Sequence, residues 1–114
     1  MEDLTHLQRH IDKCKIDTSE HRRQAQNYRN RAAADRNAGQ DSQADMLIQQ
    51  ANNEDRNAEG KENEATELES KKAQQQVEIT ELQRQLEDLK NDFNSRSKAL
   101  EQEIKSKAGT SFSL

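Results

Sequence analysis

Two heptad stripes of apolar and small residues run along this chain, and they are out of phase with each other. Apolar residues at alternating steps of three and four form a seam along one side of a helix, and each seam requires a partner helix. The first stripe ends at Ala32 and the second begins at Ala44, a step of one heptad plus five residues. A coiled coil absorbs insertions of three or four residues by local overwinding or unwinding, but five fit poorly. The stripes therefore favour a chain that folds back on itself over one continuous rod.

Pairing the two stripes in an antiparallel hairpin gives one consistent register. In such a pair, a positions of one helix face d positions of the other, and the numbers of facing residues have a constant sum. Ala32 with Leu47 and Ile11 with Leu68 both give 79, which centres the turn between Gly39 and Gln40. The predicted hairpin seam consists of Leu4, Leu7, Ile11, Cys14, Tyr28, Ala32, Leu47, Ala51, Ala58, Ala65 and Leu68.

Local signals at the turn agree with this register. Glycine is common just past a helix end, because it adopts the left-handed conformation without a Cβ clash, so Gly39 is expected to end the first helix. Asp41 or Ser42 can then cap the second helix. Gly60 lies inside that second helix and marks a soft spot, since glycine costs about 1 kcal/mol relative to alanine there.

The charge distribution favours the same pairing. Residues 1–40 carry 8 Lys+Arg against 6 Asp+Glu, whereas residues 41–114 carry 10 against 16. The fold-back is expected to bring several basic residues of the first arm opposite several acidic residues of the second. These residues are Arg22, Arg23, Arg29, Arg31 and Arg36 on the first arm, and Asp45, Glu54, Asp55, Glu59 and Glu62 on the second. Exposed pairs are worth only about 0.2–1 kcal/mol each, so they select partner and register more than they stabilise.

Composition excludes an ordinary globular core. Hydrophobic residues make up 29% and charged residues 35% of the 114 residues, with one Tyr and two Phe. This composition fits either disorder or long helices that bury only a seam, and the heptads together with the absence of proline favour helices. We expect an all-α, coiled-coil helical hairpin with an extended C-terminal helix that oligomerises. Its segments are a first helix (3–38), a turn (39–41), a hairpin-paired second helix (42–75), an oligomerising coiled coil (76–107) and a flexible tail (108–114).

The strongest apolar seam of the chain has no partner within the hairpin register. The first helix is too short to cover it, because Leu4 already faces Gln75. Burying each large apolar side chain is worth about 1.5–3 kcal/mol, so a row of them requires another helix. This predicted oligomer interface consists of Ile79, Leu82, Leu86, Leu89, Phe93, Leu100 and Ile104.

No motif for catalysis or cofactor binding is recognised. The chain lacks a glycine-rich phosphate loop, G-x-S-x-G and C-x-x-C, and a two-helix rod offers no water-excluding cleft, so we expect no enzyme, no catalytic residue and no cofactor. His6 and His10 share a helix face, but no acid lies between them and no cysteine or third ligand is recognised beside them. We therefore expect solvated histidines and no metal site. Cys14, the only cysteine, is expected to be a small buried hydrophobic residue.

Three roles fit these features. The first is a non-enzymatic structural protein, a rod, spacer or scaffold subunit that self-associates in a cytoskeletal or virion type of assembly. The second is an adaptor or chaperone whose exposed C-terminal seam binds a partner helix. The third, a nucleic-acid-binding coiled coil, rests on the arginine-rich stretch 21–36, but the chain is acidic overall and no basic region adjoins the strong seam, so we expect no nucleic-acid partner.

Location in the cell follows from two absences in the sequence. No stretch reaches the roughly 20 apolar residues that cross a bilayer, and residues 1–4 lack the basic and apolar regions of a secretion signal. We therefore expect no membrane contact, and a site of action inside the cell, in the cytoplasm or in a particle assembled there.

Overall fold

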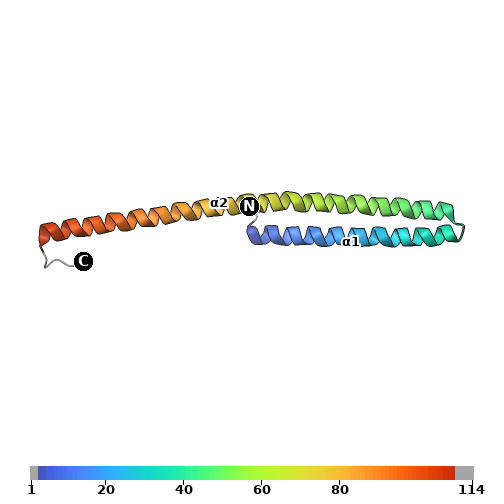
Figure 1. The fold of residues 1–114 in the computed structure, drawn as a ribbon, viewed down its shortest axis with the longest axis horizontal. Coiled ribbons are helices and arrows are strands. Elements are labelled where there is room, and N and C mark those ends of the chain that lie inside the picture. Colours follow the sequence, from blue (N-terminus) through green and yellow to red (C-terminus); the bar gives the residue numbers. More distant parts are fainter. Residues whose placement is uncertain (1–2, 110–114) are drawn as a thin grey trace. The chain divides into compact units, whose positions relative to one another are not determined.

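A computed structural model describes residues 3–109, and its regular structure consists of two helices. Helix α1 spans Leu4–Asn37 and helix α2 spans Asp41–Ala108, and no strand occurs within the described residues. The all-α helical hairpin expected from the heptads is confirmed: α1 lies antiparallel along the first part of α2 (Figure 1). Within residues 3–109, neither helix has a segment apolar enough to cross a membrane.

Helix α1 is bounded at its start by a side-chain cap. The Asp3 carboxylate accepts a hydrogen bond from the His6 backbone N–H at 2.8 Å, which satisfies one of the unpaired donors of the first turn.

A glycine cap ends α1 through two backbone hydrogen bonds. The Gln40 N–H donates to the Asp35 carbonyl at 2.8 Å, and the Gly39 N–H donates to the Arg36 carbonyl at 3.0 Å. This pair of bonds is the Schellman motif, which requires a left-handed residue, and Gly39 supplies it with a φ of 80°. The glycine predicted from sequence thus occupies the position that needs it.

Helix α2 begins one residue before the expected start. The Ala44 N–H donates to the Gln40 carbonyl at 3.0 Å, so Asp41 already lies in the first helical turn. A carboxylate there interacts favourably with the helix dipole. At the other end, Ala108 still belongs to α2, and the Gly109 N–H donates to the Lys105 carbonyl at 2.9 Å. The rest of the expected tail, 110–114, lies outside the described residues.

The chain forms two compact units that meet between Gln75 and Gln76. The first unit is the hairpin, built from α1 and the part of α2 that precedes Gln76. The second unit contains the remainder of α2. Helix α2 runs through Gly60 without interruption, so the soft spot expected there does not break the helix.

The hairpin core contains two apolar clusters at opposite ends of α1. The cluster near the turn consists of Ala32, Ala44 and Leu47, with Tyr28 and Ile48 packed against it. The cluster remote from the turn consists of Leu7, Ile11, Cys14, Ala65 and Leu68. Between them the seam is lined by small buried side chains, namely Thr18, Ala25, Ala51 and Ala58. Small residues permit close approach of the two helices but bury little apolar area.

Candidate association surface and hairpin seam

The second unit exposes a row of large apolar side chains. The seven residues predicted as the oligomer interface have exposed fractions from 36% to 69%, with Ile104 and Ile79 at the low end and Leu89 and Phe93 at the high end. By contrast, Leu7 and Ile11 in the hairpin are 1% exposed. The steps of three and four that place Leu82, Leu86 and Leu89 together put these side chains on one side of α2. The part of α2 after Gln75 therefore carries a row of apolar side chains that the other described residues leave exposed.

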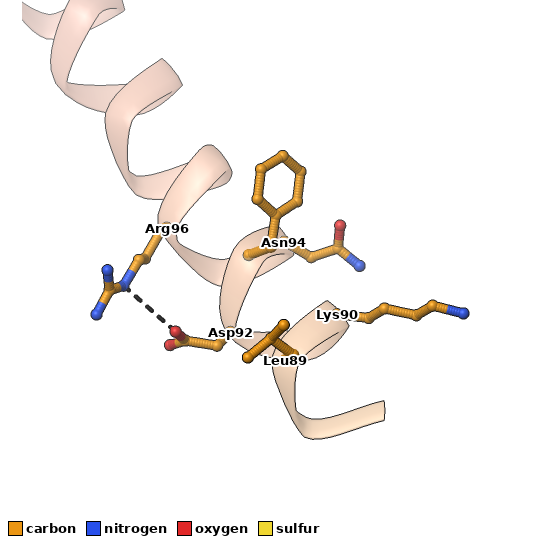
Figure 2. A pocket seen from close by; sticks show the side chains of 6 residues that line it. Leu89, Lys90, Asp92, Asn94 and Arg96 are labelled. Atoms are coloured by element: carbon orange, nitrogen blue, oxygen red, sulfur yellow. Dashed lines mark ion pairs between the residues drawn. The ribbon is translucent and has the colours of Figure 1, made fainter. Parts of the chain in front are cut away.

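A hollow of about 570 Å³ lies within this face. It is lined by Leu89, Lys90, Asp92, Phe93, Asn94 and Arg96, all from two turns of α2. Figure 2 shows that Asp92 and Arg96 stand beside each other, and they form an ion pair of 3.5 Å between Arg96 Nε and Asp92 Oδ2. A hollow formed by one helix is a gap between neighbouring side chains, and this one is open to solvent.

The structure buries most of the predicted hairpin seam. Leu7, Ile11, Cys14, Ala32, Leu47, Ala51, Ala58, Ala65 and Leu68 are buried. Leu4 and Tyr28 are only partly buried. Leu4 is the first residue of α1, so no preceding turn covers it. Tyr28 packs on the cluster near the turn and remains partly open to solvent.

A charge ladder follows one edge of the seam. Three ion pairs, each one heptad from the next, join a basic residue of α1 to an acidic residue of α2: Lys15–Glu69 at 3.1 Å, Arg22–Glu62 at 2.7 Å, and Arg29–Asp55. Arg36 and Asp45 form a further pair near the turn at 2.7 Å. Arg23 departs from the expected cross-helix pattern, because it pairs with Glu20 of its own helix at 2.5 Å.

The opposite edge of the seam carries histidines instead of arginines. His21 Nδ1 lies 2.6 Å from Glu54 Oε2, and His10 Nε2 lies 3.1 Å from Glu64 Oε1. The expectation of a solvated histidine is therefore wrong for His10, whose ring contacts a carboxylate of the partner helix. His21 likewise lies at the edge of the seam and contacts Glu54 of α2. His6 is exposed and contacts Asp3 at the start of α1.

Cys14 lies next to the His10–Glu64 pair. A ring nitrogen of His10, the Cys14 sulfur and a carboxylate oxygen of Glu64 all lie within 4.8 Å of one another. Burial and the nearby Glu64 charge raise the pKa of the Cys14 thiol. The positive charge of Lys61, whose Nζ lies 3.5 Å from Glu64 Oε2, lowers the pKa of the Glu64 carboxyl, and the His10 hydrogen bond acts in the same direction.

Sequence reasoning missed this three-residue cluster, although signals for it exist. His10 and Cys14 are four residues apart and share a face of α1, and Glu64 joins them from α2. His10 and His21 pair with residues whose numbers give nearly the same sum, 74 and 75, as expected for one edge of an antiparallel seam. Extending the constant-sum rule from the seam to its edges would have placed Glu64 beside His10.

Comparison with known proteins adds no relative to this description. No protein-family model, no curated protein and no solved structure matches the chain.

Proposed function

We propose that this protein is a non-enzymatic structural subunit, a coiled-coil rod, spacer or scaffold that self-associates through the C-terminal part of α2. The observation that carries the proposal is the exposed apolar face of the second unit, with Leu86 at 53% and Leu89 at 69% exposure. Covering such side chains is worth about 1.5–3 kcal/mol each, and a second copy of the same face can supply that cover.

The construction of the hairpin supports the same role. Its ion pairs and alanine layers hold two helices together along a seam. A hairpin of this type supplies a stiff module of defined length, while the exposed face supplies the contact to a neighbour. An assembly of the cytoskeletal or virion type requires both properties of its subunits.

The test is the mass of the purified chain in solution, measured by light scattering after size exclusion. We expect a defined oligomer for the unmodified chain and loss of association for Leu86→Asp together with Leu89→Asp, because two buried carboxylates in a helix seam cost far more than the seam gains. The matched control is Thr80→Asp with Asn91→Asp, which adds the same charge to exposed positions of α2 outside the apolar row and should leave the mass unchanged. An oligomer that survives the Leu86 and Leu89 changes would refute this interface.

A second role, an adaptor or chaperone that receives a partner helix, draws on the same exposed face. The two roles differ in what the isolated chain does. A helical oligomer of defined size supports the structural subunit. A monomer that aggregates and is rescued by a helix from another protein supports the adaptor.

Nucleic-acid binding has less support from the arrangement of charges. Arg22, Arg29 and Arg36 are each held by an acidic side chain of α2, which neutralises most of the basic stretch that would otherwise meet phosphates. A steep loss of DNA or RNA binding with rising salt would reverse this ranking of the three roles.

A further inference from the structure

The hairpin brings together three side chains that ligate transition metals. His10 and Cys14 come from successive turns of α1, and Glu64 comes from α2. Side chains four residues apart on a helix project from the same face, so His10 and Cys14 reach the same point between the helices. The residue types are imidazole, thiolate and carboxylate, each of which is an established zinc ligand.

The distances suit a tetrahedral ion after small side-chain rotations. Zinc binds nitrogen and oxygen at about 2.0–2.2 Å and sulfur at about 2.3 Å, so ligand atoms of one tetrahedral site lie roughly 3.3–3.7 Å apart. His10 Nε2 and Glu64 Oε1 are 3.1 Å apart, and all three ligand atoms lie within 4.8 Å. A metal ion would therefore take the place of the hydrogen bond between His10 and Glu64 after small side-chain rotations.

The three side chains of the cluster differ in burial: one is buried between the helices and two are partly exposed. Cys14 is 2% exposed, whereas the side chains of His10 and Glu64 are 41% and 40% exposed. The sulfur thus lies between the helices, and the imidazole and carboxylate face solvent. This arrangement allows an ion to enter from solvent and leaves a fourth position for water, as in zinc sites with three protein ligands.

Two neighbouring charges act on the site in opposite directions. The Glu64 carboxylate attracts a cation, whereas Lys61 contacts Glu64 Oε2 at 3.5 Å and repels one. Because Lys61 holds Oε2, the other oxygen, Oε1, remains directed at His10. The Cys14 thiol must lose its proton to solvent as the metal–sulfur bond forms, so binding should weaken as the pH falls.

We propose that His10, Cys14 and Glu64 form a zinc-binding site that joins α1 to α2. The ligands come from both arms of the hairpin, so metal binding and hairpin formation are coupled, and the ion acts as a clip at the end remote from the turn. The proposal is independent of the C-terminal association surface.

The test uses Co²⁺ as a spectroscopic probe on the full chain, kept reduced and free of chelators. We expect a sulfur-to-cobalt charge-transfer band that saturates at one ion per chain and disappears when Zn²⁺ is added. Cys14→Ser should abolish the band. His10→Gln and Glu64→Gln, which both keep the thiol, should each weaken Co²⁺ binding at least tenfold.

Two further variants separate a built site from adventitious binding to the thiol. His21→Gln breaks the cross-helix pair of His21 and Glu54, which is not part of the proposed site. This variant should leave Co²⁺ affinity unchanged. Lys61→Gln should tighten binding by removing the competing charge. Circular dichroism on each variant establishes that the helices are intact. Absence of the charge-transfer band would overturn the proposal. Equal Co²⁺ affinity in the His10→Gln variant, the Glu64→Gln variant and the unmodified protein would do so as well.

Discussion

The same substitution, glycine to alanine, should have opposite effects at the two glycines of the hairpin. Gly39 has a φ of 80° and closes the cap of α1, whereas Gly60 lies in the interior of α2. A Cβ added at either position meets no atom within 4 Å, so neither change introduces a clash. The sign of each effect therefore depends on backbone conformation alone.

The magnitudes follow from the two conformations. Alanine in the left-handed region costs about 1–2 kcal/mol. The unfolded chain has less conformational entropy with alanine than with glycine, which offsets part of that cost, so Gly39→Ala should destabilise the hairpin by about 1 kcal/mol. Alanine is about 0.8–1.0 kcal/mol better than glycine inside a helix, so Gly60→Ala should stabilise by roughly that amount. The two variants should thus differ by about 2 kcal/mol, and each should shift Tm by about 4–8 °C, in opposite directions.

Urea unfolding at one fixed protein concentration measures the difference. Far-ultraviolet circular dichroism follows total helix content. Tyr28 is the only tyrosine, the chain has no tryptophan, and the ring packs on the cluster near the turn, so its fluorescence reports the hairpin selectively. No effect of Gly39→Ala on the tyrosine transition would refute the left-handed cap at Gly39, and destabilisation by Gly60→Ala would contradict the expected gain from alanine inside α2.

Three further predictions test the core, the register and the first cap. Ile11→Ala should cost about 2–5 kcal/mol, whereas the same change at Ile16, which is 68% exposed, should have little effect; urea unfolding compares them. Tyr28→Cys with Ala51→Cys, in a Cys14→Ala background, should form a disulfide within one chain on oxidation, and a product linked only between chains on a denaturing gel would instead indicate a swapped dimer. The His6 N–H lowers the pKa of the Asp3 carboxyl, so this cap contributes stability above pH 3.8 that is lost as the pH falls below it; Asp3→Asn should flatten that part of an acid titration, and an unchanged titration curve would contradict the role of Asp3.

The features that sequence predicts best here are those fixed by periodicity. The phase shift between Ala32 and Ala44 and the constant sum of 79 were sufficient to place the fold-back at Gly39, because a seam has one register for a given turn. Gly39 marks the end of α1, but the backbone hydrogen bonds that set an exact helix boundary, such as the one from Ala44 to Gln40, leave no signature in side-chain identity. For the same reason the start of α2 at Asp41 was misplaced by one residue.

The contacts at the seam edges were harder to predict, because long charged side chains choose among several partners. Arg23 has an acid on its own helix three residues away and takes it in preference to the opposite arm. The cluster of His10, Cys14 and Glu64 was not predicted, because sequence motifs consist of residues close together in the chain. Here the carboxylate is contributed by the other helix.

The placement of the two apolar clusters bears on how the hairpin opens. Contacts in the cluster remote from the turn, such as Ile11 with Leu68, close a loop about four times longer than contacts near the turn, such as Ala32 with Leu47. Two doublings of loop length add about 1.2 kcal/mol of closure entropy. The larger side chains, Leu7, Ile11 and Leu68, therefore lie where that entropy is greatest. Hydrogen-bonded backbone amides beside the two clusters, near Ile11 and near Ala32, should accordingly exchange with solvent in one concerted opening, without progressive unzipping from the free end.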